Sequence, residues 1–265
     1  MSALSSAVKQ SSTKALIIGI SGCSSSGKTT LSRLLRDIFP NTTIIHQDDF
    51  YEPEERLPFR DGLRDWDCAE AVDIPGLATC LEHITTHGSL PTTLISKEDQ
   101  NEVGPSNVPP EAVEALQAQV RKFIDEASSA PAKLFLLDGF LLYPPVVHNV
   151  IAPFLHLRLL LRASYIAAKQ RRESRKGYVT LEGFWEDPPG YVDRVVWPNY
   201  VESHGFLFEG GDVEGRVDER VCGGLGLKAF HGDVSVKDAD PVGADMVECL
   251  NWAVGEVLGM LGGGQ

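Results

Sequence analysis

The chain has little positive charge. Its 265 residues include 24 lysines and arginines against 37 aspartates and glutamates, which leaves a formal net charge of −13. Nucleic acids and anionic lipid surfaces attract basic proteins, so we expect neither as a partner. An acidic protein does suit a positively charged small molecule, although an excess of acids is more often a feature that favours solubility.

Cysteine is scarce and scattered. The five cysteines are odd in number and form no Cys-x-x-Cys pair, so their spacing gives no disulfide framework. Such usage is typical of a reducing compartment. We therefore expect a cytoplasmic protein, with the nucleus left open.

Long apolar runs are also missing. The most apolar window, residues 146–161, is broken by Pro153 and Arg158, so no segment is expected to span a membrane. Residues 1–13 are rich in serine and contain no apolar segment, which argues against a secretory signal. We expect a disordered tail over residues 1–13 and a single domain over residues 14–262.

The apolar segments that are present alternate between two periodicities. Short apolar runs predict buried strands, and apolar residues at helical spacing predict amphipathic helices between them. The predicted strands cover residues 15–20, 42–47, 133–137 and 155–161, and the predicted helices cover 31–38, 74–84, 110–127, 164–175 and 246–261. This alternation predicts an α/β three-layer sandwich, in which helices cover both faces of a central, mainly parallel, five-stranded sheet.

Two segments lack these patterns. Residues 88–109 contain several prolines and are expected to form a surface loop. Residues 204–232 are rich in glycine and acids and are expected to form a loop-rich insert. Within the insert, Gly224-Leu225-Gly226 imitates a dinucleotide-binding fingerprint, but no predicted strand precedes it, so we expect a mobile loop there.

The strongest motif lies between the first predicted strand and the first predicted helix. Residues 22–29 match the P-loop pattern Gly-x-x-x-x-Gly-Lys-Ser/Thr at every fixed position. Glycines let the backbone form a nest of N–H groups around phosphate oxygens, and the following helix directs its positive dipole at the same anion. The phosphate-binding residues expected here are Gly22, Ser24, Ser25, Ser26, Gly27, Lys28, Thr29 and Thr30. The motif predicts a site for a nucleoside triphosphate.

Acidic residues follow two further strands. Asp48 and Asp49 come after the second predicted strand, and Asp138 comes directly after residues 133–137. Ligands of a doubly wound sheet bind at the carboxyl ends of its strands, so we expect these acids beside the phosphate site. A small-molecule kinase needs a carboxylate base for its acceptor and a second acid for Mg²⁺, and Asp48 and Asp138 fit these roles.

One segment reverses the overall charge. Its basic residues are Arg162, Lys169, Arg171, Arg172, Arg175 and Lys176, against the single acid Glu173. A solvated helix would usually mix both signs, so we expect residues 162–190 to form a lid over the phosphates of ATP. A guanine-binding switch is not expected, because the nearest match to Asn-Lys-x-Asp, at residues 96–99, has the wrong first residue.

Taken in order, these motifs resemble the nicotinamide riboside kinases. The resemblance covers about residues 15–75 and 133–203. It is carried by Ile18-Gly19-Ile20-Ser21-Gly22 with the P-loop, Gln47-Asp48-Asp49-Phe50-Tyr51, Trp66-Asp67, Asp138-Gly139-Phe140-Leu141-Leu142-Tyr143, Arg171-Arg172-x-x-Arg175, Pro189-Gly190-Tyr191-Val192-Asp193 and Val196-Trp197-Pro198-x-Tyr200.

The resemblance implies a P-loop kinase fold with a basic lid. It also implies transfer of the γ-phosphate of ATP to the ribose 5′-hydroxyl of nicotinamide riboside, with nicotinic acid riboside as a further candidate. Asp48 would be the catalytic base, assisted by Lys28. Thr29, Asp48 and Asp138 would bind Mg²⁺. Arg171 and Arg175 would contact the ATP phosphates.

The same resemblance assigns the nucleoside site. Asp67 and Arg172 would hold the ribose hydroxyls, and Trp66 and Tyr178 would enclose the nicotinamide ring. An aromatic face attracts a pyridinium cation, which agrees with this assignment. The remaining substrate residues would be Asp48, Asp49 and Phe50.

The chain departs from the family pattern at several places. Asp138 stands where the family usually has glutamate, and Trp66 stands where tyrosine is commoner. One extra residue separates Arg175 from Tyr178, and residues 88–132 and 204–232 look expanded.

Two other functions stay open at this point: a uridine–cytidine kinase, and an ATP-binding regulatory module without catalysis. The sequence does not determine the oligomeric state.

Overall fold

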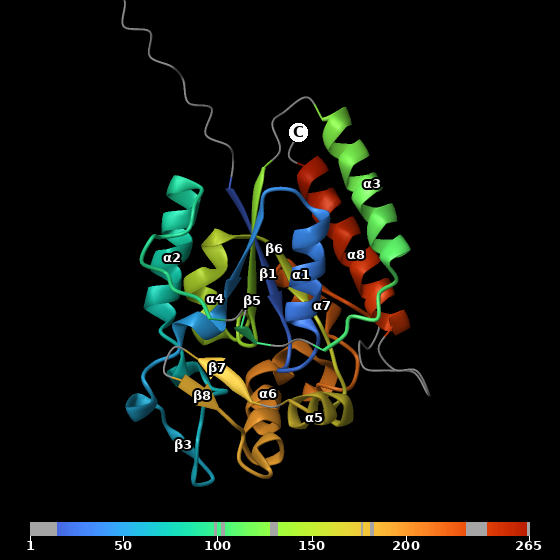
Figure 1. Cartoon of the computed structure of the whole chain (residues 1–265). Coiled ribbons are helices and arrows are strands. Elements are labelled where there is room, and N and C mark those ends of the chain that lie inside the picture. The colour runs from blue at the N-terminus through green and yellow to red at the C-terminus, as the bar shows by residue number, and fades with distance from the viewer. Residues whose placement is uncertain are drawn as a thin grey trace, which may run out of the picture.

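A five-stranded sheet forms the centre of the protein (Figure 1). The computed structural model describes residues 15–97, 100–101, 104–127, 132–175, 177–180, 183–231 and 243–263. The strand order is β2-β5-β1-β6-β9, and every neighbouring pair is parallel. The bounds are β1 Ala15–Ser21, β2 Thr42–His46, β5 Lys133–Gly139, β6 Leu155–Leu160 and β9 Leu227–Ala229. The predicted parallel α/β sandwich is confirmed.

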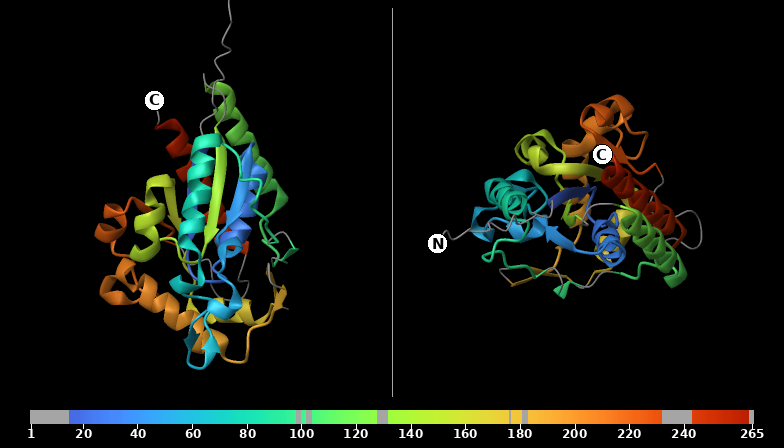
Figure 2. Two further views of the ribbon diagram at one scale, coloured as in Figure 1. Left: turned by 90° about the vertical axis from the view of Figure 1, so that its left-hand side faces the viewer. Right: turned by 90° about the horizontal axis from the view of Figure 1, so that it is seen from above.

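Alternating residues of β1 supply the cores on the two faces of the sheet. Ile18 and Ile20 belong to one buried cluster, whereas Ile17 belongs to the other. Different groups of helices cover the two faces (Figure 2). The first face is covered by α1 Lys28–Ile38, α3 Pro110–Glu126 and α8 Gly243–Gly262, and the helices on the second face include α2 Ile74–His87 and α4 Pro145–Ile151. In α1, Leu31 and Leu35 are fully buried, as their helical spacing predicts.

A smaller layer lies beyond the carboxyl ends of the strands (Figure 1). It consists of two hairpins, a helix that carries three of the basic residues of the predicted lid, and a π-helical turn that continues into another helix. Their bounds are β3 Phe59–Arg60, β4 Leu63–Arg64, α5 Tyr165–Glu173, β7 Tyr178–Thr180, β8 Gly183–Trp185, the π-turn Val192–Val196 and α6 Trp197–His204. A third buried cluster, which includes Leu57, Trp66 and Tyr191, holds this layer together.

The loop-rich insert expected over residues 204–232 contains more regular structure than predicted. Helix α7, Glu219–Gly224, and strand β9 lie in this region, and β9 supplies the fifth strand of the sheet. Gly226 has a φ of 63° and turns the chain from α7 into β9. A strand of three residues is too short to show a periodic pattern, which explains why it was missed.

The other segment predictions fare differently. The described part of residues 88–109 contains no strand and no α-helix, and only Gln100 has 3₁₀-helical conformation. The tail expected over residues 1–13, and Lys176 of the lid, lie outside the described residues.

Among the described helices, none has the length and apolar composition needed to cross a membrane. All five cysteines are described, and no disulfide joins them. The single-domain assignment stays a prediction.

Candidate active site

The turn between β1 and α1 requires glycine at two positions. Gly22 has a φ of 149°, and a Cβ atom there would lie 2.2 Å from the carbonyl oxygen of Leu161. Gly27 has a φ of 97°, and a Cβ atom there would lie 2.8 Å from Met246 Cε. Only a residue without a side chain fits such backbone geometry and such close neighbours. The fixed glycines of the P-loop are therefore needed for the shape of the turn itself.

Lys28 lies buried at the start of α1. Its Nζ donates a hydrogen bond of 2.9 Å to the carbonyl oxygen of Cys23, inside the same turn. Burial lowers the pKa of Lys28, and the nearby charge of Asp138 opposes that change. Within the described residues, the buried hydroxyls of Ser25 and Ser26 have no hydrogen-bond partner. The turn thus holds a cation together with unsatisfied donors, which suits an anionic ligand.

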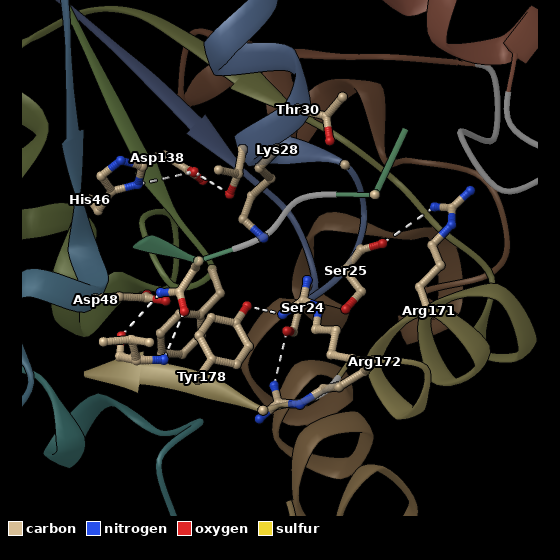
Figure 3. A pocket seen from close by; sticks show the side chains of 18 of the residues that line it. Ser24, Ser25, Lys28, Thr30, His46, Asp48, Asp138, Arg171, Arg172 and Tyr178 are labelled. Atoms are coloured by element: carbon tan, nitrogen blue, oxygen red, sulfur yellow. Dashed lines mark hydrogen bonds and ion pairs between the residues drawn. The ribbon is translucent and has the colours of Figure 1, made fainter. Parts of the chain in front are cut away.

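Asp138 ends β5 directly opposite the P-loop. The Thr29 hydroxyl donates to Asp138 Oδ2 over 2.6 Å, and His46 Nδ1 lies 3.5 Å from the same oxygen (Figure 3). Burial alone would raise the pKa of Asp138, but the hydrogen bond from His46 and the charge of Lys28 hold it below its ordinary value. Asp138 is therefore ionised at neutral pH.

Asp48 faces the same site from the end of β2. Burial and the neighbouring charge of Asp138 raise the pKa of Asp48 to about 6, against the opposing charge of Lys28. Two acids whose environments push their pKa values apart are characteristic of acid–base sites. Asp48 is thus a carboxylate that accepts a proton close to neutral pH.

Oxygen ligands for a divalent cation gather at this point. Mg²⁺ prefers carboxylate and hydroxyl oxygens and usually keeps several of its waters. The hydroxyl of Thr29 and the carboxylate of Asp138 fit an ion held in this way. Asp48 is close enough for the charges of Asp48 and Asp138 to interact. Among the described residues, no group of three or more histidines, cysteines or acids forms a closed metal site. The metal set Thr29, Asp48 and Asp138 stays a prediction.

The lid contacts the P-loop through two arginines of α5. Arg171 donates to the carbonyl oxygen of Ser25 at 3.3 Å, and Arg172 Nη1 donates to the Ser24 hydroxyl at 2.9 Å (Figure 3). These contacts bring the basic segment against the phosphate-binding turn. The role of residues 162–190 as a lid over ATP stays a prediction.

Arg172 also lies between two carboxylates. It binds Asp67 through two hydrogen bonds of 2.9 and 3.2 Å, and it binds Asp187 through two of 2.6 and 3.2 Å. Arg172 and Asp67 are buried, and Asp187 is partly exposed. Sequence reasoning paired Asp67 with Arg172 through a common ligand but missed Asp187. Its only signal was its place just before Pro188-Pro189-Gly190-Tyr191, close to a quoted motif.

Trp66 lines the cavity and is buried beside two other aromatic rings. Its side chain is 6% exposed, and its ring centroid lies 5.2 Å from that of Tyr51 and 5.5 Å from that of Trp185. Among the described ring contacts, Trp66 is not paired with Tyr178. Tyr178 instead accepts a hydrogen bond from Arg175, whose guanidinium lies 4.8 Å from the centre of its ring. Enclosure of a ligand ring by Trp66 and Tyr178 stays a prediction, and sequence reasoning missed Trp185.

One cavity of about 790 Å³ collects most of the expected site residues. This volume lies in the usual range for small-molecule sites. The expected residues that line it are Ser24, Ser25, Gly27, Lys28, Thr29, Thr30, Asp48, Asp49, Trp66, Asp67, Asp138, Arg171, Arg172, Arg175 and Tyr178. Gly22, Ser26 and Phe50 do not line it. Phe50 packs against the main hydrophobic core, and Ser26 is fully buried in the turn.

Besides lining the cavity, Asp49 contacts the loop over residues 88–109. Burial raises its pKa, while hydrogen bonds from the Ser96 side chain and the Lys97 backbone oppose that rise. Asp49 therefore ties the loop over residues 88–109 to the end of β2. Residues of this loop, Lys97, Gln100, Asn101, Gly104, Pro105, Ser106 and Asn107, line the same cavity. The segment expected to be a mere surface loop contributes a wall of the site.

Comparison with known proteins gives a consistent result. The chain is 41% identical over 212 residues to nicotinamide riboside kinase of Schizosaccharomyces pombe, which covers 78% of this chain and 87% of that protein. It is 33% identical over 250 residues to nicotinamide riboside kinase of Saccharomyces cerevisiae, which covers 93% and 97% respectively. Human nicotinamide riboside kinase 2 is 30% identical over 186 residues, or 70% and 66% of the two chains.

No protein-family model matches the chain. The curated relatives show the family, because two of them are 41% and 33% identical to this chain over 87% and 97% of their own lengths. The alternatives of a uridine–cytidine kinase and of a non-catalytic module are not favoured by these relatives. This chain belongs to the nicotinamide riboside kinase family.

Proposed function

We propose that this protein transfers the γ-phosphoryl group of ATP to the ribose 5′-hydroxyl of nicotinamide riboside, a step of NAD salvage. The observation that carries the proposal is the placement of Asp48. This carboxylate, whose pKa is raised to about 6, lines the same cavity as Lys28 of the P-loop and as Trp66 and Asp67. A base, a triphosphate site and a nucleoside site in one cavity are the parts that phosphoryl transfer to an alcohol needs.

The roles on the phosphate side follow from charge and position. Asp48 accepts the proton of the attacking hydroxyl. Lys28, Arg171 and Arg175 place positive charge around the transferring group, where negative charge is spread over its oxygens. When Mg²⁺ is bound, it neutralises charge on the β- and γ-phosphates. Thr29 and Asp138 would hold it, with Asp48 close by.

The nucleoside side is an acidic pocket with an aromatic wall. The cluster of Asp67, Asp187 and Arg172 carries one positive and two negative charges, so its net charge is negative. Trp66 and Trp185 stand beside it. A nucleoside with a fixed pyridinium charge is attracted by both features. A neutral base such as uracil gains from neither charge effect, which is why the cationic nucleoside is proposed.

A panel of nucleosides tests the proposal. Purified protein is incubated with Mg-ATP and nicotinamide riboside, nicotinic acid riboside, uridine or cytidine, and products are identified by mass. We expect nicotinamide riboside to have the highest kcat/KM and to gain one phosphoryl group. Comparable or faster phosphorylation of uridine would overturn the assignment of the acceptor. Absence of any phosphorylated nucleoside would overturn the catalytic role.

We further propose that the reaction takes place in the cytoplasm.

A further inference from the structure

The loop of residues 88–109 and the lid are joined through one side chain. The N–H of Val179 in β7 donates to Asn101 Oδ1 over 2.7 Å, and Asn101 Nδ2 donates to the carbonyl oxygen of Val179 over 3.1 Å. The carbonyl oxygen of Asn101 accepts a third hydrogen bond, of 3.2 Å, from Arg33 Nη2 in α1. Asn101 thus links the helix that follows the P-loop to the hairpin of the lid.

The contact occupies the free edge of the hairpin. Strands β7 and β8 are antiparallel, with Val179 opposite Phe184. In such a ladder, alternate residues direct both main-chain groups away from the partner strand. Val179 is one of these residues, and the carboxamide of Asn101 satisfies both groups as a neighbouring strand would. A two-stranded hairpin has marginal stability on its own, so its position depends on contacts of this kind.

The hairpin lines the cavity and contacts Arg175, which is expected on the phosphate side. Tyr178, Val179, Phe184 and Trp185 all line the cavity, and Tyr178 accepts a hydrogen bond from Arg175. On the other side, the loop is held to β2 through Asp49, as described above. The two segments therefore meet across a cavity that also contains the P-loop.

We propose that Asn101 is a positioning residue that holds the β7–β8 hairpin against the cavity and so limits access of water to the γ-phosphate. Its consequence for catalysis rests on the proposed function. In productive transfer, the bond between the γ-phosphorus and the β–γ bridging oxygen breaks, and the ribose oxygen takes the phosphoryl group. If water enters instead, the same bond breaks, and ADP, inorganic phosphate and a proton are the products. Closure of an active site reduces this side reaction.

Hydrogen exchange tests the contact without any substrate. In Asn101→Ala the acceptor of the Val179 N–H is lost, whereas Asn101→Asp keeps an acceptor and loses only the donor to the Val179 carbonyl. We expect the Val179 amide of the ligand-free protein to exchange at least about tenfold faster in Asn101→Ala and to stay protected in Asn101→Asp. The control is Asn251→Ala in α8, which also removes one side-chain bond to a backbone carbonyl. Unchanged exchange in Asn101→Ala would overturn the proposed contact.

The fraction of ATP that is hydrolysed by water, instead of being used to phosphorylate the nucleoside, tests the proposed effect on catalysis. ADP and phosphorylated nucleoside are measured in the same reaction, and the excess of ADP gives the fraction lost to water. We expect that fraction to rise several-fold in Asn101→Ala, with Asn101→Asp intermediate and Asn251→Ala equal to wild type. Faster amide exchange with an unchanged fraction would overturn the role in water exclusion. If the wild-type protein phosphorylates no nucleoside, the proposed function fails, while the exchange result still decides the contact.

Discussion

The Thr29 hydroxyl and the Asp138 carboxylate are joined by a hydrogen bond of 2.6 Å, which connects the first turn of α1 to the end of β5. Both groups belong to the types that bind Mg²⁺ in phosphoryl-transfer sites. In this structure the hydroxyl and the carboxylate satisfy each other. When Mg²⁺ is bound, Thr29 and Asp138 would hold it together.

Removal of the Thr29 hydroxyl should therefore raise the Mg²⁺ requirement. Thr29→Val keeps the shape of the side chain and loses the oxygen, whereas Thr29→Ser keeps the oxygen. We expect the Mg²⁺ concentration for half-maximal rate to rise about tenfold or more in the valine variant. The serine variant should stay within about threefold of wild type. Equal Mg²⁺ dependence in all three proteins would show that Thr29 does not hold the metal.

The raised pKa of Asp48 predicts an acidic limb in the activity profile. The base works only when unprotonated, and its pKa in the ligand-free protein is raised to about 6. We expect kcat/KM for the nucleoside to fall about tenfold per pH unit below that value. In the complex, Mg²⁺ favours the carboxylate, so the limb of kcat should lie at lower pH than that of kcat/KM. A kcat/KM that stays constant from pH 7 to pH 5 would contradict the assignment.

Loss of Arg172 should destabilise the folded protein. Arg172→Met leaves the buried Asp67 and its neighbour Asp187 without their common cation. Breaking a buried ion pair from one side costs about 3–5 kcal/mol. Urea unfolding should show a loss of this order, and part of it should return when Asp67→Asn is added. Arg194→Met is the matched control, because its partner Asp61 is exposed, and we expect little change there. Similar stability of both variants would contradict the role of the cluster.

The aromatic wall should matter more for a cationic nucleoside than for ATP. In Trp66→Leu the site loses a π face beside Trp185. A desolvated cation–π contact is worth about 2 kcal/mol, so the KM for nicotinamide riboside should rise about 10- to 30-fold. The KM for ATP should change little. Trp252→Leu in α8, where the ring contacts Phe230, controls for general loss of packing. An equal rise for both substrates would indicate a purely structural role of Trp66.

The parts of the site that were predictable depend on short-range constraints. The geometry of one turn requires glycine at positions 22 and 27, and Lys28 follows in the same motif, so eight positions of sequence were enough to identify the turn. Asp48 and Asp138 were found because parallel strands end at the same edge of the sheet. Local pattern and fold topology together gave the core of the phosphate site.

The parts that were missed depend on contacts between distant segments. Asp187 becomes a partner of Arg172 only after the hairpin β7–β8 has reversed the chain. Asn101 and Val179 are 78 positions apart, and neither belongs to a motif. No periodicity or spacing encodes such pairs, because the loop and the lid are placed by the rest of the fold. The same reason explains why the loop was expected at the surface rather than at the cavity.

The most direct test of the account is phosphoryl transfer by Asp48→Asn, measured beside its affinity for Mg-ATP by calorimetry. The raised pKa of Asp48 means that folding disfavours its charged form, so the neutral asparagine should not destabilise the protein at pH 7. We predict that kcat for nicotinamide riboside falls about 10²- to 10⁴-fold, while the Kd for ATP stays within a few-fold of wild type. A variant that keeps most of its turnover would contradict the central claim that this carboxylate takes the proton of the acceptor.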